Sequence, residues 1–229
     1  MSLYLLLDLA SIAIPLVFSF EKRIRFFKMG KALFISIFSV GLVFVLWDSY
    51  FTRLGVWGFN PKYLCGLYIF NLPLEEYLFF ICVPYASVFT FEVFRTLLPQ
   101  FSIQKKTLRN FVISCATVLL LTGIIFYRRK YTCSTMLFAS LSLYAAYYYF
   151  PSLLPHFILS FGAILLPFFI MNGILTGTFI EGEVVWYNNN ENLGTRLLTI
   201  PVEDIFYGMS LILWNINLTA SLQKKFSKK

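Results

Sequence analysis

Charged residues are scarce in this chain, and their scarcity excludes a soluble globular domain. Only 13% of the 229 residues are charged and 59% are hydrophobic, whereas ordinary soluble domains carry about 25% charged residues. We therefore expect an integral membrane protein. The net charge of +8 does not indicate binding to nucleic acid, because the basic residues form short clusters between apolar runs, as they do beside membrane helices.

Several classes of cofactor-dependent membrane protein are excluded by residues that the sequence lacks. No lysine lies in the interior of an apolar run, so retinal has no attachment point of the rhodopsin kind. The one histidine, His156, cannot build the multi-histidine di-iron site of a membrane desaturase. None of the 12 glycines forms a G-x-G pattern, so a dinucleotide fingerprint is missing. No two aspartates stand a few residues apart to bind magnesium diphosphate.

The four cysteines also lack the spacing of a metal or redox site. None forms a C-x-x-C pair, and all lie in or beside apolar runs. We interpret them as buried structural thiols. The sequence therefore predicts that the protein uses no metal and no cofactor.

Apolar runs long enough to cross a membrane, about 17 to 25 residues, occur seven times. They fall at about 3–20, 31–50, 73–94, 109–127, 132–150, 153–176 and 201–220. If these spans alternate, most of the 19 Lys and Arg residues lie on one side, in segments 22–31, 95–109 and 224–229. The positive-inside rule then predicts a cytoplasmic (inner) membrane protein with its N-terminus outside and its C-terminus in the cytoplasm, although the basic turn at 128–130 argues the other way.

An acidic motif that occurs twice is the most informative feature of the sequence. Residues 71–80 read N-L-P-L-E-E-Y-L-F-F and residues 199–207 read T-I-P-V-E-D-I-F-Y. Because proline is tolerated in the first turn of a helix, Pro73 and Pro201 predict helix starts. Charged groups are costly at the mouth of a membrane helix and usually indicate function, which makes four carboxylates the candidate catalytic residues: Glu75, Glu76, Glu203 and Asp204.

The spacing of the motifs extends to other residues and predicts an internal repeat. The offset from Pro73 to Pro201 also relates Asn60 to Asn188 and, with a four-residue gap, Trp47-Asp48 to Met171-Asn172. We predict an all-α integral membrane fold with seven transmembrane helices. Spans 1–3 and 5–7 form two parallel three-helix repeats, and the fourth span links them, with domain boundaries at 1–108, 109–131 and 132–229. Both motifs then face the same side of the membrane, where one pocket can hold both.

The chemistry of these residues favours acid–base work on a hydrocarbon. Adjacent residues diverge by about 100° around a helix, so only one carboxylate of each pair can face the bundle interior. Two inward carboxylates in a low dielectric share a proton and titrate as a pair, and aromatic faces stabilise a cation without trapping it. The candidate substrate-binding residues near the motifs are Trp47, Asp48, Asn60, Phe79, Phe80, Asn172, Trp186, Asn188, Phe206 and Tyr207.

Some of these candidates have a second interpretation that the sequence leaves open. Asp48 is either a hydrogen-bond partner of the motif or an interfacial residue that snorkels to water. Asn60 and Asn188 either orient the motif helices or are ordinary loop residues.

The chain resembles the membrane lycopene cyclases of the bacterial two-subunit type and their fused single-chain relatives, which are unrelated to the flavin-dependent cyclases. The resemblance rests on the paired P-x-E-[ED] motifs and on three further segments: F-E-K-R at 20–23, W-G-F-N at 57–60, and V-P at 83–84 leading to F-E at 91–92. It covers nearly the whole chain. Because two motifs occur in one chain, it is similar to the fused form, with the fourth span as the linker.

This resemblance implies a redox-neutral isomerisation that cyclises the acyclic ends of lycopene, giving γ-carotene and then β-carotene. An acidic side chain protonates the terminal double bond, the ring closes to a tertiary cation, and a carboxylate removes a ring proton. We favour Glu75 and Glu203 as the acid–base pair, tuned by Glu76 and Asp204, and the reverse assignment stays open. The expected partners are the carotenoid substrate and membrane lipid; a homo-oligomer stays open.

A small membrane transporter built from parallel three-helix repeats is the alternative. Its intramembrane carboxylates would then act as a proton relay. The spans are aromatic and aliphatic rather than rich in Asn, Ser and Gln, which argues against a sugar pore.

Overall fold

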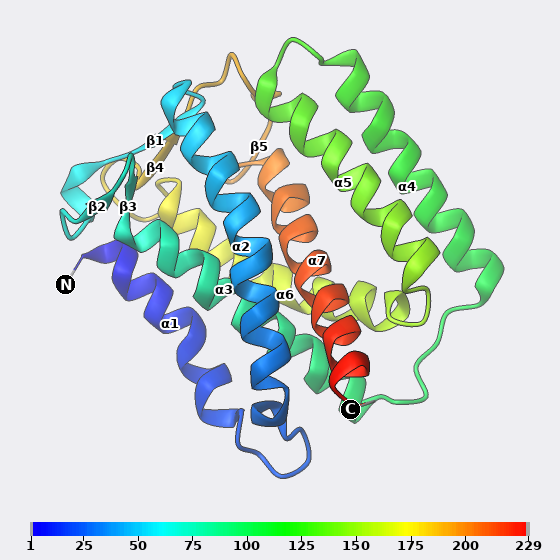
Figure 1. Ribbon diagram of the computed structural model, residues 1–229. Helices are drawn as coiled ribbons and strands as arrows, with labels where there is room; N and C mark the ends of the chain where they lie inside the picture. The colour runs from blue at the N-terminus through cyan, green and yellow to red at the C-terminus, as the bar shows by residue number, and fades with distance from the viewer. Residues whose placement is uncertain (1, 228–229) are drawn as a thin grey trace.

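The computed structural model describes residues 2–227, and seven α-helices lie in that range (Figure 1). They are α1 (Leu3–Phe18), α2 (Gly30–Arg53), α3 (Leu74–Leu97), α4 (Lys105–Ile125), α5 (Lys130–Tyr149), α6 (Leu154–Leu175) and α7 (Val202–Phe226). Each coincides with one predicted apolar run to within a few residues, so the mostly helical fold is confirmed. The lysines at 228 and 229, which belong to a basic cluster used to predict the orientation, lie outside the described residues.

Five helical segments in this part of the chain are long and apolar enough to cross a membrane. They are the run from the short helix η1 (Phe26–Met29) through α2, and the helices α3, α4, α6 and α7. Helix α1 is apolar but has only 16 residues. The helices indicate a membrane protein, while the prediction that α1 and α5 also cross stays a prediction.

Short strands in the loops before α3 and α7 refine the expected all-α fold. Strand β1 (Trp57–Phe59) pairs antiparallel with β4 (Val185–Tyr187) and so joins the two loops. Strand β2 (Tyr68–Ile69) pairs with β3 (Leu72–Pro73), and β5 (Arg196–Leu197) pairs with β6 (Ile200–Pro201). A single turn of 3₁₀ helix, η2, covers Pro61–Tyr63. Runs of two or three residues show no alternation pattern, which is why the sequence did not predict these strands.

The two hairpins deliver the chain directly into the motif helices. Pro73 and Pro201 have extended backbones, with ψ angles of 153° and 137°, and α3 and α7 begin one residue later. The acidic residues thus occupy the first helical turn, where the backbone N–H groups have no intrahelical partner and the helix dipole favours negative charge.

The helices pack so that both motif helices begin at one end of the bundle, which we call the loop end. Helix α1 packs on α3 and α5 packs on α7, while α2 lies against α7 and α3, and α6 lies against α3. Figure 1 shows α4 at the edge of the bundle beside α5, and the strands β1 to β4 gathered at the loop end. This arrangement positions the two acidic motifs near one another.

Candidate functional site

The first carboxylate of each motif is fully buried and holds the surrounding chain together. Glu75 accepts hydrogen bonds from the Ser2 hydroxyl at 2.6 Å and from the Cys65 backbone N–H at 2.6 Å. Glu203 has the same two kinds of donor. The hydroxyl of Thr132, near the start of a helix, donates to it at 2.6 Å, and the backbone N–H of Leu193, ten residues upstream, donates at 2.7 Å. Each of these carboxylates therefore ties a loop to two helix starts.

The second carboxylate of each motif faces a cavity between the helices. Glu76 accepts a hydrogen bond from the Tyr4 hydroxyl at 2.6 Å. Asp204 accepts one from the Tyr131 hydroxyl and another from the Tyr187 hydroxyl, the latter at 3.0 Å. Both carboxylates and all three tyrosines line the same cavity of about 360 Å³, a size within the usual range for small-molecule sites.

A third carboxylate stands beside these two. Asp48, near the end of α2, is 2% exposed and accepts hydrogen bonds from the Trp57 indole N–H and the Thr52 hydroxyl. It lines the cavity next to Glu76. The loop end of the cavity therefore holds three carboxyl groups within a mainly apolar surrounding, an arrangement suited to moving a proton without bulk water.

Aromatic rings surround the carboxyl groups. Tyr131 and Tyr187 stack with ring centroids 5.9 Å apart, and Trp57 meets Tyr131 edge-on at 5.0 Å. Phe79, Tyr207 and Phe168 line the adjoining wall. Ring faces attract a cation but offer it no nucleophile, so this end of the cavity can stabilise a carbocation.

The hydroxyl of Tyr187, which lies in the loop strand β4, is a permanent donor. Its burial, followed by the negative charge of Asp204, raises the pKa of Tyr187 well above its ordinary value. The phenol therefore stays protonated at physiological pH and continues to donate to the carboxylate.

The remainder of the cavity is apolar and extends along α3. Its lining there comes from a single face of the helix, at Phe79, Val83, Ala86 and Thr90, because positions three and four apart share a helix face. Residues of α1, α6 and α7 form the other walls. The site thus combines a polar end with a long hydrocarbon-compatible body.

The predicted site residues fall into two groups. The cavity is lined by Glu76 and Asp204 and by four of the predicted substrate-binding residues, Asp48, Phe79, Asn172 and Tyr207. The other candidates lie outside its wall: Glu75, Glu203, Trp47, Asn60, Phe80, Trp186, Asn188 and Phe206.

The residues outside the wall have other contacts in the structure. Trp47 and Phe80 pack against Phe44 in the helix core. The side chains of Asn60 and Asn188 accept backbone hydrogen bonds two residues on, from Lys62 and Asn190, so they shape their own loops. Trp186 covers Gly58, where a Cβ atom would lie 2.4 Å from the indole ring, and Phe206 packs on the main core.

Three tyrosines of the site were not among the predicted site residues. Tyr4 and Tyr131 lie in the first turns of α1 and α5, and Tyr187 lies in β4. In the predicted topology all odd-numbered spans start on the same side of the membrane, so spans one and five start beside the two motifs. A tyrosine near the start of each of these spans was therefore a signal from which Tyr4 and Tyr131 could have been predicted. In the described chain no group of three His, Cys, Asp or Glu side chains is arranged to hold a metal ion.

Comparison with known proteins identifies similarity to one family. A family model described as "Lycopene cyclase" matches residues 1–94 and 128–222. A protein of Podospora anserina named "Bifunctional lycopene cyclase/phytoene synthase" is 28% identical over 81 residues, which cover 35% of this chain and 13% of that protein. The matched segment is therefore a small part of that relative. No solved structure matches the chain.

Proposed function

Because this chain belongs to the lycopene cyclase family, we propose that it cyclises the acyclic ends of lycopene, giving γ-carotene and then β-carotene. The observation that carries the proposal is the meeting of Glu76 and Asp204 in one aromatic-lined cavity. The family match also favours a cyclase over the transporter alternative. The carotenoid enters and leaves through membrane lipid, and a homo-oligomer stays a prediction.

We assign the chemistry to the second carboxylate of each motif. Asp204 accepts two phenol hydrogen bonds, which favour its ionised form and suit it to act as the base. Glu76 accepts one and lies beside Asp48, and two neighbouring carboxyl groups in a buried site retain a proton between them. Glu76 is therefore the proposed acid. Glu75 and Glu203 act as positioning residues. By fixing the starts of α3 and α7, they hold Glu76 and Asp204 in place.

The proposed reaction balances without an oxidant or reductant. Glu76 transfers its proton to the terminal double bond, a new carbon–carbon bond closes the ring, and the positive charge rests on a tertiary ring carbon. Asp204 then removes a proton from the neighbouring ring carbon to form the ring alkene. The two carboxyl groups exchange their proton before the next turnover, so the product is an isomer of the substrate. The surrounding rings of Tyr131, Tyr187 and Phe79 stabilise the cation.

Both motifs serve one cavity, so the two ends of lycopene react in turn. A pigment time course in a lycopene-accumulating host is expected to show γ-carotene before β-carotene. Glu76→Gln and Asp204→Asn each remove cyclisation, because an amide neither donates an acidic proton nor accepts one. Glu92→Gln is the matched control, since Glu92 is also a buried carboxyl of α3 but pairs with Arg95 away from the cavity.

The assignment fails if Glu76→Gln or Asp204→Asn converts lycopene as fully as the unmodified protein. The proposed function itself fails if the unmodified protein leaves lycopene unchanged. Protein levels in the membrane fraction, measured alongside the pigments, separate lost chemistry from lost protein.

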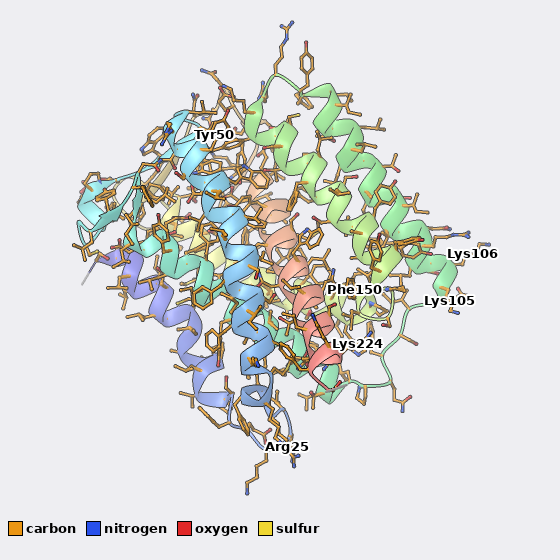
Figure 2. The ribbon with its side chains drawn as sticks, viewed as in Figure 1. Arg25, Tyr50, Lys105, Lys106, Phe150 and Lys224 are labelled. Carbon is orange, nitrogen blue, oxygen red and sulfur yellow. The ribbon has the colours of Figure 1, made fainter. Side chains whose placement is uncertain are left out.

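The proposed orientation puts the loop end outside the cytoplasmic membrane and the opposite end in the cytoplasm. Figure 2 supports it, with Arg25 and Lys224 near the end away from the strands and Tyr50 near the loop end. Cys65 lies exposed in the loop before α3, so its interpretation as a buried thiol is wrong. A membrane-impermeant maleimide is therefore expected to label it in intact cells whose outer layers are permeable. A Cys65→Ser chain carrying Arg25→Cys is expected to react only after lysis, and the reverse pattern contradicts the orientation.

We also propose that the seven helices form two repeats joined by α4. The matching donors of Glu75 and Glu203, and the two matched segments of the family model on either side of residues 95–127, support this. The boundaries 1–108, 109–131 and 132–229 stay predictions.

A further inference from the structure

The cavity is open on one side, between α1 and α6, away from the carboxyl groups. We call this opening the lateral slot, and its edges are Ala10 and Ile14 on α1 and Pro167 on α6. All three line the cavity and are also exposed at the molecular surface, Ile14 to 68%. We propose that the slot admits an acyclic polyene sideways from the lipid and holds its chain along α3 while its end reacts. This inference rests on the proposed function.

The surface around the slot is suited to hydrocarbon. Val17 lies one turn beyond Ile14 on α1 and Leu166 adjoins Pro167 on α6, and these two side chains are 72% and 70% exposed. They are apolar side chains, and none of the exposed positions of α1 and α6 carries a charged residue. An opening of this kind faces the acyl chains of a bilayer rather than water.

The loop end, by contrast, is closed above the carboxyl groups. The pairing of β1 with β4 crosses it, and the Trp57 side chain is 6% exposed beneath this cover. Gly58 lies directly under the Trp186 ring, where even a Cβ atom finds no space. A water-insoluble chain therefore has its shortest route to Glu76 and Asp204 through the slot.

The floor of the cavity has the length of an extended chain segment. From Glu76 to Thr90 the lining stripe of α3 runs about 21 Å at 1.5 Å per residue. The lining becomes less bulky away from the carboxyl end, from Phe79 through Val83 to Ala86 and Ser87. A long linear polyene fits this shape, with its reactive end among the carboxyl groups and its remainder along α3.

A matched pair of substitutions tests the entrance. Ile14→Trp narrows the slot, and Val17→Trp puts the same ring on the same helix at similar exposure but outside the cavity lining. With purified protein in liposomes loaded with lycopene, we expect Ile14→Trp to lower kcat/KM by about tenfold or more, as bulky side chains do in filled spaces. Val17→Trp is expected to stay within about twofold of the unmodified protein.

A second substitution tests where the chain lies. Thr90→Phe fills the far end of the α3 stripe and is expected to lower kcat/KM for lycopene by about tenfold, because shape complementarity governs hydrocarbon binding. Its activity on a shortened polyene with the same acyclic end stays unchanged, since that molecule ends before Thr90. Equal losses on both substrates, or no loss on either, would overturn the placement along α3.

The outcomes separate this inference from the proposed function. If the unmodified protein cyclises lycopene while Ile14→Trp and Val17→Trp behave alike, the slot is overturned and the proposed function stands. If the unmodified protein converts neither polyene, the proposed function falls and the slot falls with it. Thermal unfolding of each variant in detergent shows whether a loss comes from the fold.

Discussion

Two faces of the bundle flank the motif helices, and they differ in what fills them. On the face formed by α1, α3, α6 and α7 lies the cavity, with Ala10 and Ala86 in its wall. On the face formed by α2, α5 and α7 the space is filled by aromatic rings. At the offset that separates the two motifs, Ala10 corresponds to Phe138 and Ala86 to Trp214.

The aromatic filling of the second face is extensive. Phe138 lies 5.7 Å from Phe44 and 5.4 Å from Trp47 between ring centroids, and it stacks with Trp214 at 6.4 Å. The Trp214 indole N–H also donates to the Ser142 hydroxyl at 2.9 Å. Bulky rings at these positions therefore fill one face of the bundle, while small side chains at the corresponding positions leave a cavity on the other.

The largest effect is expected when the cavity face receives the aromatic residues that stand at the corresponding positions of the filled face. Ala10→Phe together with Ala86→Trp fills the chamber, and we expect cyclisation to fall by at least about 100-fold because substrate no longer reaches the carboxyl groups. Pigment chromatography in a lycopene-accumulating host measures the loss. Val118→Trp, a change of similar bulk at an exposed position of α4 outside the cavity lining, is expected to keep activity. Full conversion by the filled variant would show that the chemistry takes place elsewhere.

Glu76 and Asp204, the two carboxylates that face the cavity, differ in the hydrogen bonds that they accept. A substitution that removes one of the donors tests this difference. Tyr187→Phe takes from Asp204 one of its two phenol donors. We expect kcat to fall about tenfold with little change in KM, since the donor acts on the base rather than on substrate binding. Tyr148→Phe, at an exposed site, is the control. An unchanged kcat for Tyr187→Phe would argue against Asp204 as the base.

Emptying the filled face is expected to affect stability more than activity. Phe138→Ala removes a ring that packs on Phe44 and Trp47 and is expected to cost about 2–3 kcal/mol in the free energy of unfolding. Cyclase activity per folded molecule should persist, because the reaction chamber is on the other face. Denaturant unfolding in detergent gives the first quantity and pigment assays the second. A large loss of activity with unchanged stability would place Phe138 in the substrate path.

The smallest expected effect concerns the loops. The Lys130 ammonium lies 2.6 Å from a carboxylate oxygen of Glu191. Burial by itself raises the pKa of Glu191, but the hydrogen bonds from Lys130 outweigh this effect and leave the pKa below its ordinary value. Lys130→Met is expected to cost at most about 1 kcal/mol. Since the pKa is depressed in the folded state, this stabilisation is present at neutral pH and is lost as the pH falls through that pKa.

The matched control lies in the other loop. Lys62 and Glu181 form an exposed pair at 3.5 Å, and Lys62→Met is expected to cause no measurable change in thermal stability. A difference between Lys130→Met and the unmodified protein that does not begin to shrink as the pH falls below the ordinary carboxyl pKa of about 4.3 would contradict the role given to Glu191.

The positions of the helices and the motifs were predictable from the sequence. Long apolar runs have no alternative to helix in a membrane, because every backbone polar group must be paired within the segment. Proline fixes an extended backbone at Pro73 and Pro201 and so marks the helix starts. The matched spacing of the two motifs also predicted that both motifs face the same side, where one pocket can hold both.

The orientation of each carboxylate was beyond the sequence. Glu75 and Glu76 differ by about 100° around α3, and the rotation of that helix is set by its packing against α1 and α6. The favoured assignment to Glu75 and Glu203 rested on no such information, and the observed hydrogen bonds favour the reverse. Tyr4 and Tyr131 reach the motifs from 72 and 73 residues away, a distance over which local pattern carries no signal.

By itself, then, the sequence determined a helical membrane protein with two acid pairs at helix starts on one side, since helix formation and proline geometry are local. Tertiary structure alone decided which acid of each pair faces the chamber, which tyrosines hold it, and which face of the bundle stays open. These outcomes depend on how seven helices rotate and fill space against one another, and packing of that kind is a property of the whole bundle.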